Sequence, residues 1–252
     1  MKKYALIGWE ISTRLSEKIH RGNFAMDGLE ATYDTLEIAP DEFDRRIPEL
    51  LKEYDGLNVT RPYKERIIPF LTKLDESAKK YKSVNTVRRC ECHGDTTGFN
   101  TDVPAFLELY GSSLVGMRIL VVGAGGAGRP IAEALEKEVF DTKVANMNRV
   151  ENAEALEQSM AAGELDVVIN ATPAELTFKV PDWVSVIDLR PDHGGERMLL
   201  LQARKSEELW NPKAHHHDHD CHCHGDHSHD ERSDCHDDHC HCHSHSGDHD
   251  HA

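Results

Sequence analysis

Residues 117–128 read Met-Arg-Ile-Leu-Val-Val-Gly-Ala-Gly-Gly-Ala-Gly. The first half is a nearly continuous apolar run, which is typical of a buried parallel strand. The second half fits G-x-G-x-x-G, where the glycines permit a tight turn, close approach to a pyrophosphate, and close packing of helix on strand. A helix pattern follows over 127–139, and its amino terminus would attract an anion. The segment predicts a dinucleotide site formed by Gly123, Gly125, Gly126, Ala127 and Gly128; the alternative is a turn that serves packing alone.

Outward from this turn, strand and helix patterns alternate along the chain. Strands are expected at 3–7, 31–38, 57–59, 83–88, 96–99, 143–147, 166–169 and 184–187. Helices are expected at 15–24, 40–54, 64–71, 103–110, 153–160 and 196–210. His93-Gly94-Asp95 is a turn signal that predicts a hairpin between two of the strands. This alternation predicts an α/β fold with a parallel sheet covered by helices on both faces.

Charge and composition argue against several classes of function. The chain has 252 residues and a formal net charge of -16, which argues against nucleic-acid binding, because phosphates need a basic surface. It has no apolar run of the roughly 20 residues that a membrane span requires. The apolar stretch near the amino terminus is too short for a secretory signal, so we expect a cytoplasmic protein in which disulfides are not the default. Cys90 and Cys92 lie in the predicted hairpin, where surface thiols are a simpler interpretation than metal ligands.

Two polar loops each carry one ionisable side chain. Residues 56–64 read GLNVTRPYK and end in Lys64, and residues 98–102 read GFNTD and end in Asp102. An ammonium can protonate a developing alkoxide, and a nearby carboxylate can position it. Beside a redox cofactor, this pair predicts proton transfer coupled to hydride transfer, as in an alcohol dehydrogenase of small polar molecules. The alternative for any such pair is a surface salt bridge.

The strand after the glycine turn indicates which cofactor is bound. Folds that prefer NAD usually place Asp or Glu about 20 residues beyond the turn, where it holds the ribose hydroxyls. Here the strand end carries Asn148 and Arg149. Because a guanidinium favours a 2′-phosphate, we expect NADP rather than NAD; the alternative is a solvated surface arginine.

Seven motifs in this order resemble the shikimate dehydrogenase family over nearly all of residues 3–210. They are N-V-T-x-P-x-K at 58–64, V-N-T at 84–86, G-x-N-T-D at 98–102, G-A-G-G-A at 123–127, N-R at 148–149, I-N-A-T-P at 169–173 and M-L-x-x-Q-A at 198–203. The resemblance implies NADP-dependent, reversible reduction of 3-dehydroshikimate to shikimate. It implies that Lys64 is the acid/base with Asp102 as its partner. It further implies that Asn58, Thr60, Asn85 and Gln202 bind the ring hydroxyls, and that Asn170 and Thr172 contact the cofactor.

The resemblance also implies the domain organisation. A substrate-binding α/β lobe would span 1–102 and be completed by a C-terminal helix at 195–212. A Rossmann-like NADP-binding lobe would span 103–194, and a separate tail would follow at 213–252. The family's active site lies between two such lobes. The sequence leaves open whether the protein is a monomer or a homodimer.

The chain departs from the family pattern in four places. The family usually has S-x-S near the amino terminus to bind a substrate carboxylate, but this chain has Arg14-Leu15-Ser16. Ser16 keeps one hydroxyl, and Arg14 either pairs with the carboxylate or blocks the pocket. Neighbouring positions also differ: Trp9, Glu10, Glu17 and Arg21 stand where the family favours asparagine or proline. Val150 replaces a threonine of the adenosine-phosphate loop, and the segment 188–197 is shortened. These differences keep open a paralogue acting on another cyclic hydroxy acid such as quinate.

Residues 215–252 form a tail of unusual composition. They contain 15 of the 18 histidines and five of the seven cysteines, without Leu, Ile, Val, Phe or Met. Such a segment cannot bury a core and is expected to be disordered without a ligand. Imidazole and thiolate together favour Zn, Ni or Cu(I). The predicted ligands are His215, His216, His217, His219, Cys221, His222, Cys223, His224, His239, Cys240, His241, Cys242 and His243. A metal-buffering protein with a vestigial dehydrogenase body is the remaining hypothesis.

Overall fold

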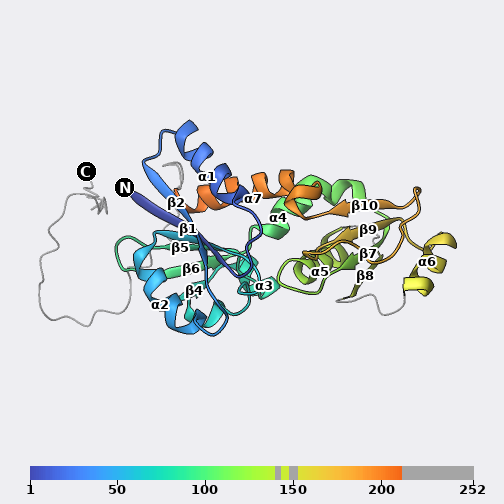
Figure 1. The fold of residues 1–252 in the computed structure, drawn as a ribbon, viewed down its shortest axis with the longest axis horizontal. Helices are drawn as coiled ribbons and strands as arrows, with labels where there is room; N and C mark the ends of the chain where they lie inside the picture. Colours follow the sequence, from blue (N-terminus) through green and yellow to red (C-terminus); the bar gives the residue numbers. More distant parts are fainter. Residues whose placement is uncertain (140–142, 148–152, 212–252) are drawn as a thin grey trace, which may run out of the picture. The chain divides into compact units, whose positions relative to one another are not determined.

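The computed structural model describes residues 1–139, 143–147 and 153–211, and its part Met1–Lys213 forms one compact unit. Two β-sheets organise this unit (Figure 1). Outside the described residues lie Asn148, Arg149, Val150 and all the predicted metal ligands at 215–243.

The first sheet has six strands in the order β2-β1-β3-β5-β6-β4. Their bounds are β1 Lys2–Gly8, β2 Ala31–Glu37, β3 Gly56–Val59, β4 Lys73–Leu74, β5 Thr86–Arg89 and β6 Thr96–Phe99. β1 runs parallel to β2 and β3, whereas β5 is antiparallel to β3 and β6. The sheet is therefore mixed, and the predicted hairpin at β5–β6 is confirmed. Helices α1 (Leu15–Met26), α2 (Phe43–Glu53) and α3 (Glu76–Tyr81) accompany it.

The second sheet has four strands in the order β10-β9-β7-β8, all of them parallel. Their bounds are β7 Arg118–Val122, β8 Lys143–Met147, β9 Val167–Asn170 and β10 Ser185–Asp188. Helices α5 (Gly128–Glu138) and α6 (Ala153–Ala161) belong to this part. The predicted parallel α/β arrangement is confirmed here. We call the part built on the six-stranded sheet the first lobe and the part built on the four-stranded sheet the second lobe.

Two helices connect the lobes. α4 (Asp102–Tyr110) starts at the end of the first sheet, and its Val103 and Phe106 pack in one core with Ile119 of β7 and Ile131 of α5. α7 (Glu196–Trp210) follows the second lobe and adds Met198 to the same core. The first lobe has its own core in which β1 and β3 pack against α2. Apolar burial thus holds each sheet to its helices and both lobes to α4 and α7.

The end of α7 returns to the first sheet. The Trp210 ring stacks on Tyr4 of β1 at 4.4 Å, and its Nε1–H donates to the Val87 carbonyl of β5 at 2.9 Å. A Cβ placed on Gly56 would lie 2.3 Å from Trp210 Nε1, so this position of β3 requires glycine. The last helix of the described chain is therefore part of the first lobe.

An ion pair ties two strands of the second sheet where they begin. Arg118 of β7 donates from its backbone N–H, Nε and Nη2 to the Asp166 carboxylate just before β9, with a shortest distance of 2.6 Å. These hydrogen bonds hold the pKa of Asp166 at about 2, well below its usual range.

Most element predictions agree with the structure to within three residues at each end, but one does not, and two short elements were not predicted. The helix predicted at 64–71 is wrong: this stretch is a series of turns with a short 3₁₀ helix at Ile68–Phe70. Pro69 explains the difference, because it lacks an N–H and its ring clashes with the preceding helical turn. The strand β4 and helix α3 were not predicted, since both are too short to show a period. Asp75 caps α3 by accepting from Ala78 N–H at 3.1 Å.

Among the described residues, none of the helices has the length and apolar character needed to cross a bilayer.

Candidate active site

The structure brings Lys64 and Asp102 together. Lys64 Nζ donates to Asp102 Oδ2 at 2.6 Å, although 38 residues separate them in the sequence. The Lys64 side chain is 13% exposed and that of Asp102 only 2%. Because the pair is largely shielded from solvent, it is not the surface salt bridge that formed the alternative interpretation.

Asp102 is held in place by the two loops that flank the β5–β6 hairpin. Its Oδ1 accepts from Asn85 Nδ2 at 3.0 Å, and the same Nδ2 donates to Thr101 Oγ1 at 2.8 Å. Asn85 Oδ1 in turn accepts from the Thr101 backbone N–H at 2.7 Å. Asn85 precedes β5 and Thr101 follows β6, so the antiparallel pairing of these strands aligns the three residues. Both carboxylate oxygens of Asp102 therefore have a fixed hydrogen-bond partner.

Asn58 is buried in a network of protein hydrogen bonds. Its Oδ1 accepts from the Tyr33 hydroxyl at 2.7 Å, and its Nδ2 donates to the Asn85 carbonyl at 3.2 Å and to Ser206 Oγ at 3.0 Å. The residue is 7% exposed. Through these hydrogen bonds Asn58 links β3 to β2, β5 and α7. Both the oxygen and the nitrogen of its side-chain amide are hydrogen-bonded to other residues of the protein. The predicted contact of Asn58 with a substrate hydroxyl remains a prediction.

The other predicted substrate-binding residues have different surroundings. Ser16 lies on α1, where its hydroxyl is 3.1 Å from that of Tyr33. Tyr33 donates its only proton to Asn58, so Ser16 is the donor to Tyr33. Thr60 and Gln202 are half-buried, on the loop after β3 and on α7 respectively. Gln202 lies one helical turn before Ser206, whose hydroxyl contacts Thr86 at 2.8 Å.

Arg14 does not lie in this group. It precedes α1, its side chain is 69% exposed, and its guanidinium donates to Glu17 at 2.9 Å. Burial favours the neutral carboxyl of Glu17, but hydrogen bonds from Arg14 and Thr35 outweigh it and lower the pKa of Glu17 below its ordinary value. Arg14 therefore pairs with Glu17 of α1, and its predicted role toward a substrate carboxylate remains a prediction.

The glycine turn follows β7 and precedes α5, as the sequence predicts. Gly123 has a φ of +111°, a conformation that favours glycine, and a Cβ there would lie 2.9 Å from the Ala171 carbonyl oxygen. A Cβ on Gly128 would lie 1.9 Å from the Gly123 carbonyl oxygen. Gly125 is exposed and has open space around it. Gly123 and Gly128 are therefore tightly packed against neighbouring backbone. Gly125 is exposed just before α5, at the position where a pyrophosphate would bind.

The glycine turn also touches Lys64. A Cβ on Gly126 would lie 2.8 Å from Lys64 Cβ, and Ser83 Oγ donates to the Gly126 carbonyl at 2.6 Å. Arg129, the second residue of α5, reaches back to Glu65 at 2.8 Å. The predicted cofactor turn of the second lobe and the ionisable pair of the first lobe are therefore direct neighbours.

Asn170 and Thr172 follow β9, next to the glycine turn. Asn170 is fully buried, and its Oδ1 accepts from the Thr172 hydroxyl at 2.8 Å. Asn170 Nδ2 donates to the Ala174 carbonyl at 2.9 Å, and Thr172 Oγ1 lies 2.9 Å from the same carbonyl oxygen. These contacts fix the loop against which Gly123 packs. Their predicted contact with the cofactor is not tested by this geometry.

Three residues at the site were missed by the sequence-based prediction: Tyr33, Ser83 and Ser206. Tyr33 is fully buried on β2, and the strand pattern predicted at 31–38 does not distinguish it from a core residue. Ser83 directly precedes the V-N-T motif, and Ser206 lies one helical turn after Gln202. Proximity to a motif was the only available signal for the two serines.

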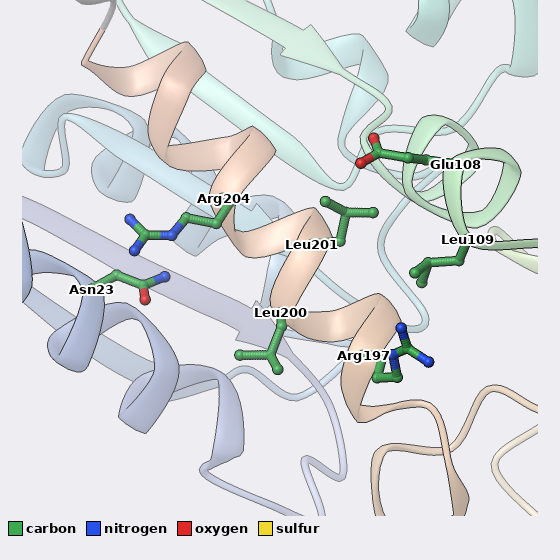
Figure 2. A pocket seen from close by; sticks show the side chains of 7 residues that line it. All are labelled: Asn23, Glu108, Leu109, Arg197, Leu200, Leu201 and Arg204. Atoms are coloured by element: carbon green, nitrogen blue, oxygen red, sulfur yellow. The ribbon is translucent and has the colours of Figure 1, made fainter.

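The structure also contains a hollow of about 370 Å³ between α1, α4 and α7. Figure 2 shows the side chains that line it: Asn23, Glu108, Leu109, Arg197, Leu200, Leu201 and Arg204. None of these residues belongs to the predicted active site. We therefore keep this hollow separate from the Lys64–Asp102 pair.

Replacing Gly128 with alanine is expected to destabilise the protein by several kcal/mol, because the added methyl group would overlap the Gly123 carbonyl and force the turn to open. The free energy of unfolding measured in urea checks this. Gly125→Ala is the matched control, since its methyl group would enter open space, and its effect should stay within about 0.5 kcal/mol. Equal stability of the two variants would contradict the described turn.

The fold and the site together define a two-lobed α/β protein with a Rossmann-type lobe and a Lys–Asp pair beside its glycine turn. Comparison with known proteins agrees with this description of the fold and the site. Residues 6–87 match the family model described as the shikimate dehydrogenase substrate binding domain. Shikimate dehydrogenase (NADP(+)) of Staphylococcus aureus (strain MRSA252) is 38% identical over 208 residues, which cover 75% of each chain.

Solved structures resemble this fold as well. Shikimate 5-dehydrogenase from Thermus thermophilus, in complex with NADP(H) and shikimate, has a TM-score of 0.67 and 26% identity, over 84% of this chain and 94% of that one. Shikimate dehydrogenase from Aquifex aeolicus has a TM-score of 0.68 and 27% identity, over 84% of this chain and 93% of that one. The chain belongs to the shikimate dehydrogenase family, and it is an oxidoreductase of the class that acts on CH–OH groups.

Proposed function

We propose that this protein catalyses the NADP-dependent, reversible reduction of 3-dehydroshikimate to shikimate. The contact between Gly126 and Lys64 is the observation that carries the proposal. It brings the Lys64–Asp102 pair, the most shielded Lys–Asp pair of the described residues, beside the turn that would hold a dinucleotide. The curated relative from Staphylococcus aureus is named for this activity, and the Thermus thermophilus structure contains both ligands.

The residues present fit a dinucleotide. Gly125 leaves open space at the start of α5, where unpaired backbone N–H groups and the helix dipole favour a pyrophosphate. NADPH, when bound there, would supply the hydride. Arg149 is proposed to hold the 2′-phosphate, which is the basis for NADP over NAD. Residues 103–194 would thus form the cofactor lobe, and residues 1–102 with the helix 195–212 the substrate lobe.

Lys64 and Asp102 are proposed to move the proton. In the reductive direction the Lys64 ammonium donates its proton to the carbonyl oxygen, which becomes the hydroxyl of shikimate. In the oxidative direction the neutral amine takes the proton back. Asp102 orients Lys64 through the 2.6 Å hydrogen bond and stabilises its charge. Asn85 keeps Asp102 in place, and Thr60 and Gln202, both half-buried, are available to the ring hydroxyls.

The proposal is tested by following NADPH formation from shikimate and NADP⁺. We expect kcat/KM to be at least tenfold higher for shikimate than for quinate, because a site built for particular hydroxyls rejects analogues that place them differently. Replacing NADP⁺ by NAD⁺ should cost at least tenfold, since the proposed arginine contact is lost. Preference for quinate would favour the paralogue hypothesis. A protein that binds NADP⁺ but oxidises neither acid would indicate a vestigial body.

We further propose that residues 215–252 bind Zn, Ni or Cu(I), because 15 histidines and five cysteines occur there. No metal is needed for the proposed hydride transfer.

A further inference from the structure

The loop that joins β5 to β6 brings three metal-binding side chains together. The ligand atoms of Cys90, Cys92 and His93 all lie within 4.8 Å of one another, and the two Sγ atoms are 2.9 Å apart. We propose that this hairpin tip is a Zn²⁺ site that is separate from the active site. Two thiolates and one imidazole are the donor set that Zn²⁺ prefers.

The dimensions fit a tetrahedral ion. Thiolates about 2.3 Å and an imidazole nitrogen about 2.1 Å from Zn²⁺ lie about 3.5–3.8 Å from one another at tetrahedral angles. The three ligand atoms are within 4.8 Å of one another, and rotation of the cysteine side chains would have to move the two Sγ atoms apart from 2.9 Å to this spacing. The described residues supply three ligands, and the fourth position can be taken by water. Each thiol releases its proton to solvent as the Zn–S bond forms, and no oxidation state changes.

The backbone of the loop is fixed before any ion binds. The Cys90 N–H donates to the Asp95 carbonyl at 2.7 Å, and the Gly94 N–H donates to the Cys90 carbonyl at 3.0 Å. Gly94 has a φ of +72°, which allows the chain to reverse there. A preformed loop lowers the ordering cost of coordination, which is the main penalty for metal sites in flexible segments.

Charge and access also suit an ion. The two carboxylates in the loop form salt bridges with lysines: Glu91 pairs with Lys2 of β1, and Asp95 pairs with Lys73 of β4 at 3.9 Å. They therefore tie the loop to the sheet and do not compete with the cysteines for the ion. Cys92 and His93 are exposed and Cys90 is half-buried, so an ion can enter from solvent.

The site can be tested in the full chain by differential alkylation. The protein is kept reduced, free Zn²⁺ is buffered in the nanomolar range, and N-ethylmaleimide labelling is followed by tryptic digestion. Cleavage after Arg89 and Arg118 isolates Cys90 and Cys92 in one peptide, 90–118, apart from the five tail cysteines. We expect Zn²⁺ to slow labelling of this peptide at least tenfold, and a chelator to restore the rate.

Two variants make the test specific. The His93→Ala variant should lose most of the Zn²⁺ protection against labelling at the same free Zn²⁺ concentration. The His193→Ala variant should retain it, because His193 is an exposed histidine beside Asp192 in the second lobe. Protection confined to the tail peptides would overturn the proposal. Protection of 90–118 that only a reductant removes would identify a Cys90–Cys92 disulfide and would also overturn it.

Discussion

Replacing Lys64 with alanine is expected to lower kcat for shikimate oxidation by NADP⁺ by on the order of 10²-fold or more, with a smaller change in KM. The reason is that Lys64 would be the group that exchanges a proton with the reacting oxygen, an interaction that matters most in the transition state. Steady-state kinetics with both substrates varied would measure the effect. The Lys64 side chain is only 13% exposed, so solvent cannot easily replace the ammonium.

Lys137→Ala is the control for this prediction. Lys137 lies on α5 and forms an exposed pair with Glu133, so its loss should leave kcat unchanged. Asp102→Asn should also lower kcat, because a neutral amide neither stabilises the ammonium nor orients it as strongly. If Lys64→Ala kept a turnover within a few-fold of the unchanged protein, the assigned role of Lys64 would be wrong, even if the protein proved to be a shikimate dehydrogenase.

Trp210→Ala is expected to reduce the free energy of unfolding by about 3–5 kcal/mol, the range for removing a large buried aromatic ring. The ring is 7% exposed, stacks on Tyr4, and covers Gly56 of β3. Its loss would also leave the Val87 carbonyl without the indole N–H. Equilibrium urea unfolding, followed by circular dichroism, measures the change.

The chain contains a matched control for this second prediction. Trp183 is 70% exposed, so Trp183→Ala should change the free energy of unfolding by less than about 0.5 kcal/mol. Similar losses in both variants would mean that α7 does not complete the core of the first lobe as described.

Local patterns predicted much of this structure. The apolar run and glycines at 117–128 determine a buried strand, a tight turn and a helix within a few residues of one another, so the sequence alone was sufficient there. Motif order was sufficient for the Lys64–Asp102 pair, which the structure joins across 38 residues. The helix predicted at 64–71 is wrong because the prediction rested on apolar spacing alone, whereas Pro69, which lacks an N–H, does not allow a regular helix there.

Long-range contacts account for what could not be predicted. The hydroxyl of Tyr33 reaches Asn58 only because β2, β1 and β3 lie side by side, and no local pattern contains that order. The occupied amide of Asn58 and the ion pair of Arg14 with Glu17 depend on side-chain geometry in the same way. A motif can name a residue of the site without showing which of its atoms remain available to a ligand.

The return of α7 to the first sheet has a consequence for biosynthesis. Trp210 contacts a partner 123 positions earlier, so the aromatic layer of β1 remains uncovered while the whole second lobe leaves the ribosome. Premature termination or a proteolytic cut within 103–194 would release a fragment with Tyr4 and Phe24 exposed to water, a surface prone to aggregation. A chain that lacks a complete second lobe would therefore also have an incomplete first lobe, and its exposed apolar surface would make it a target for degradation.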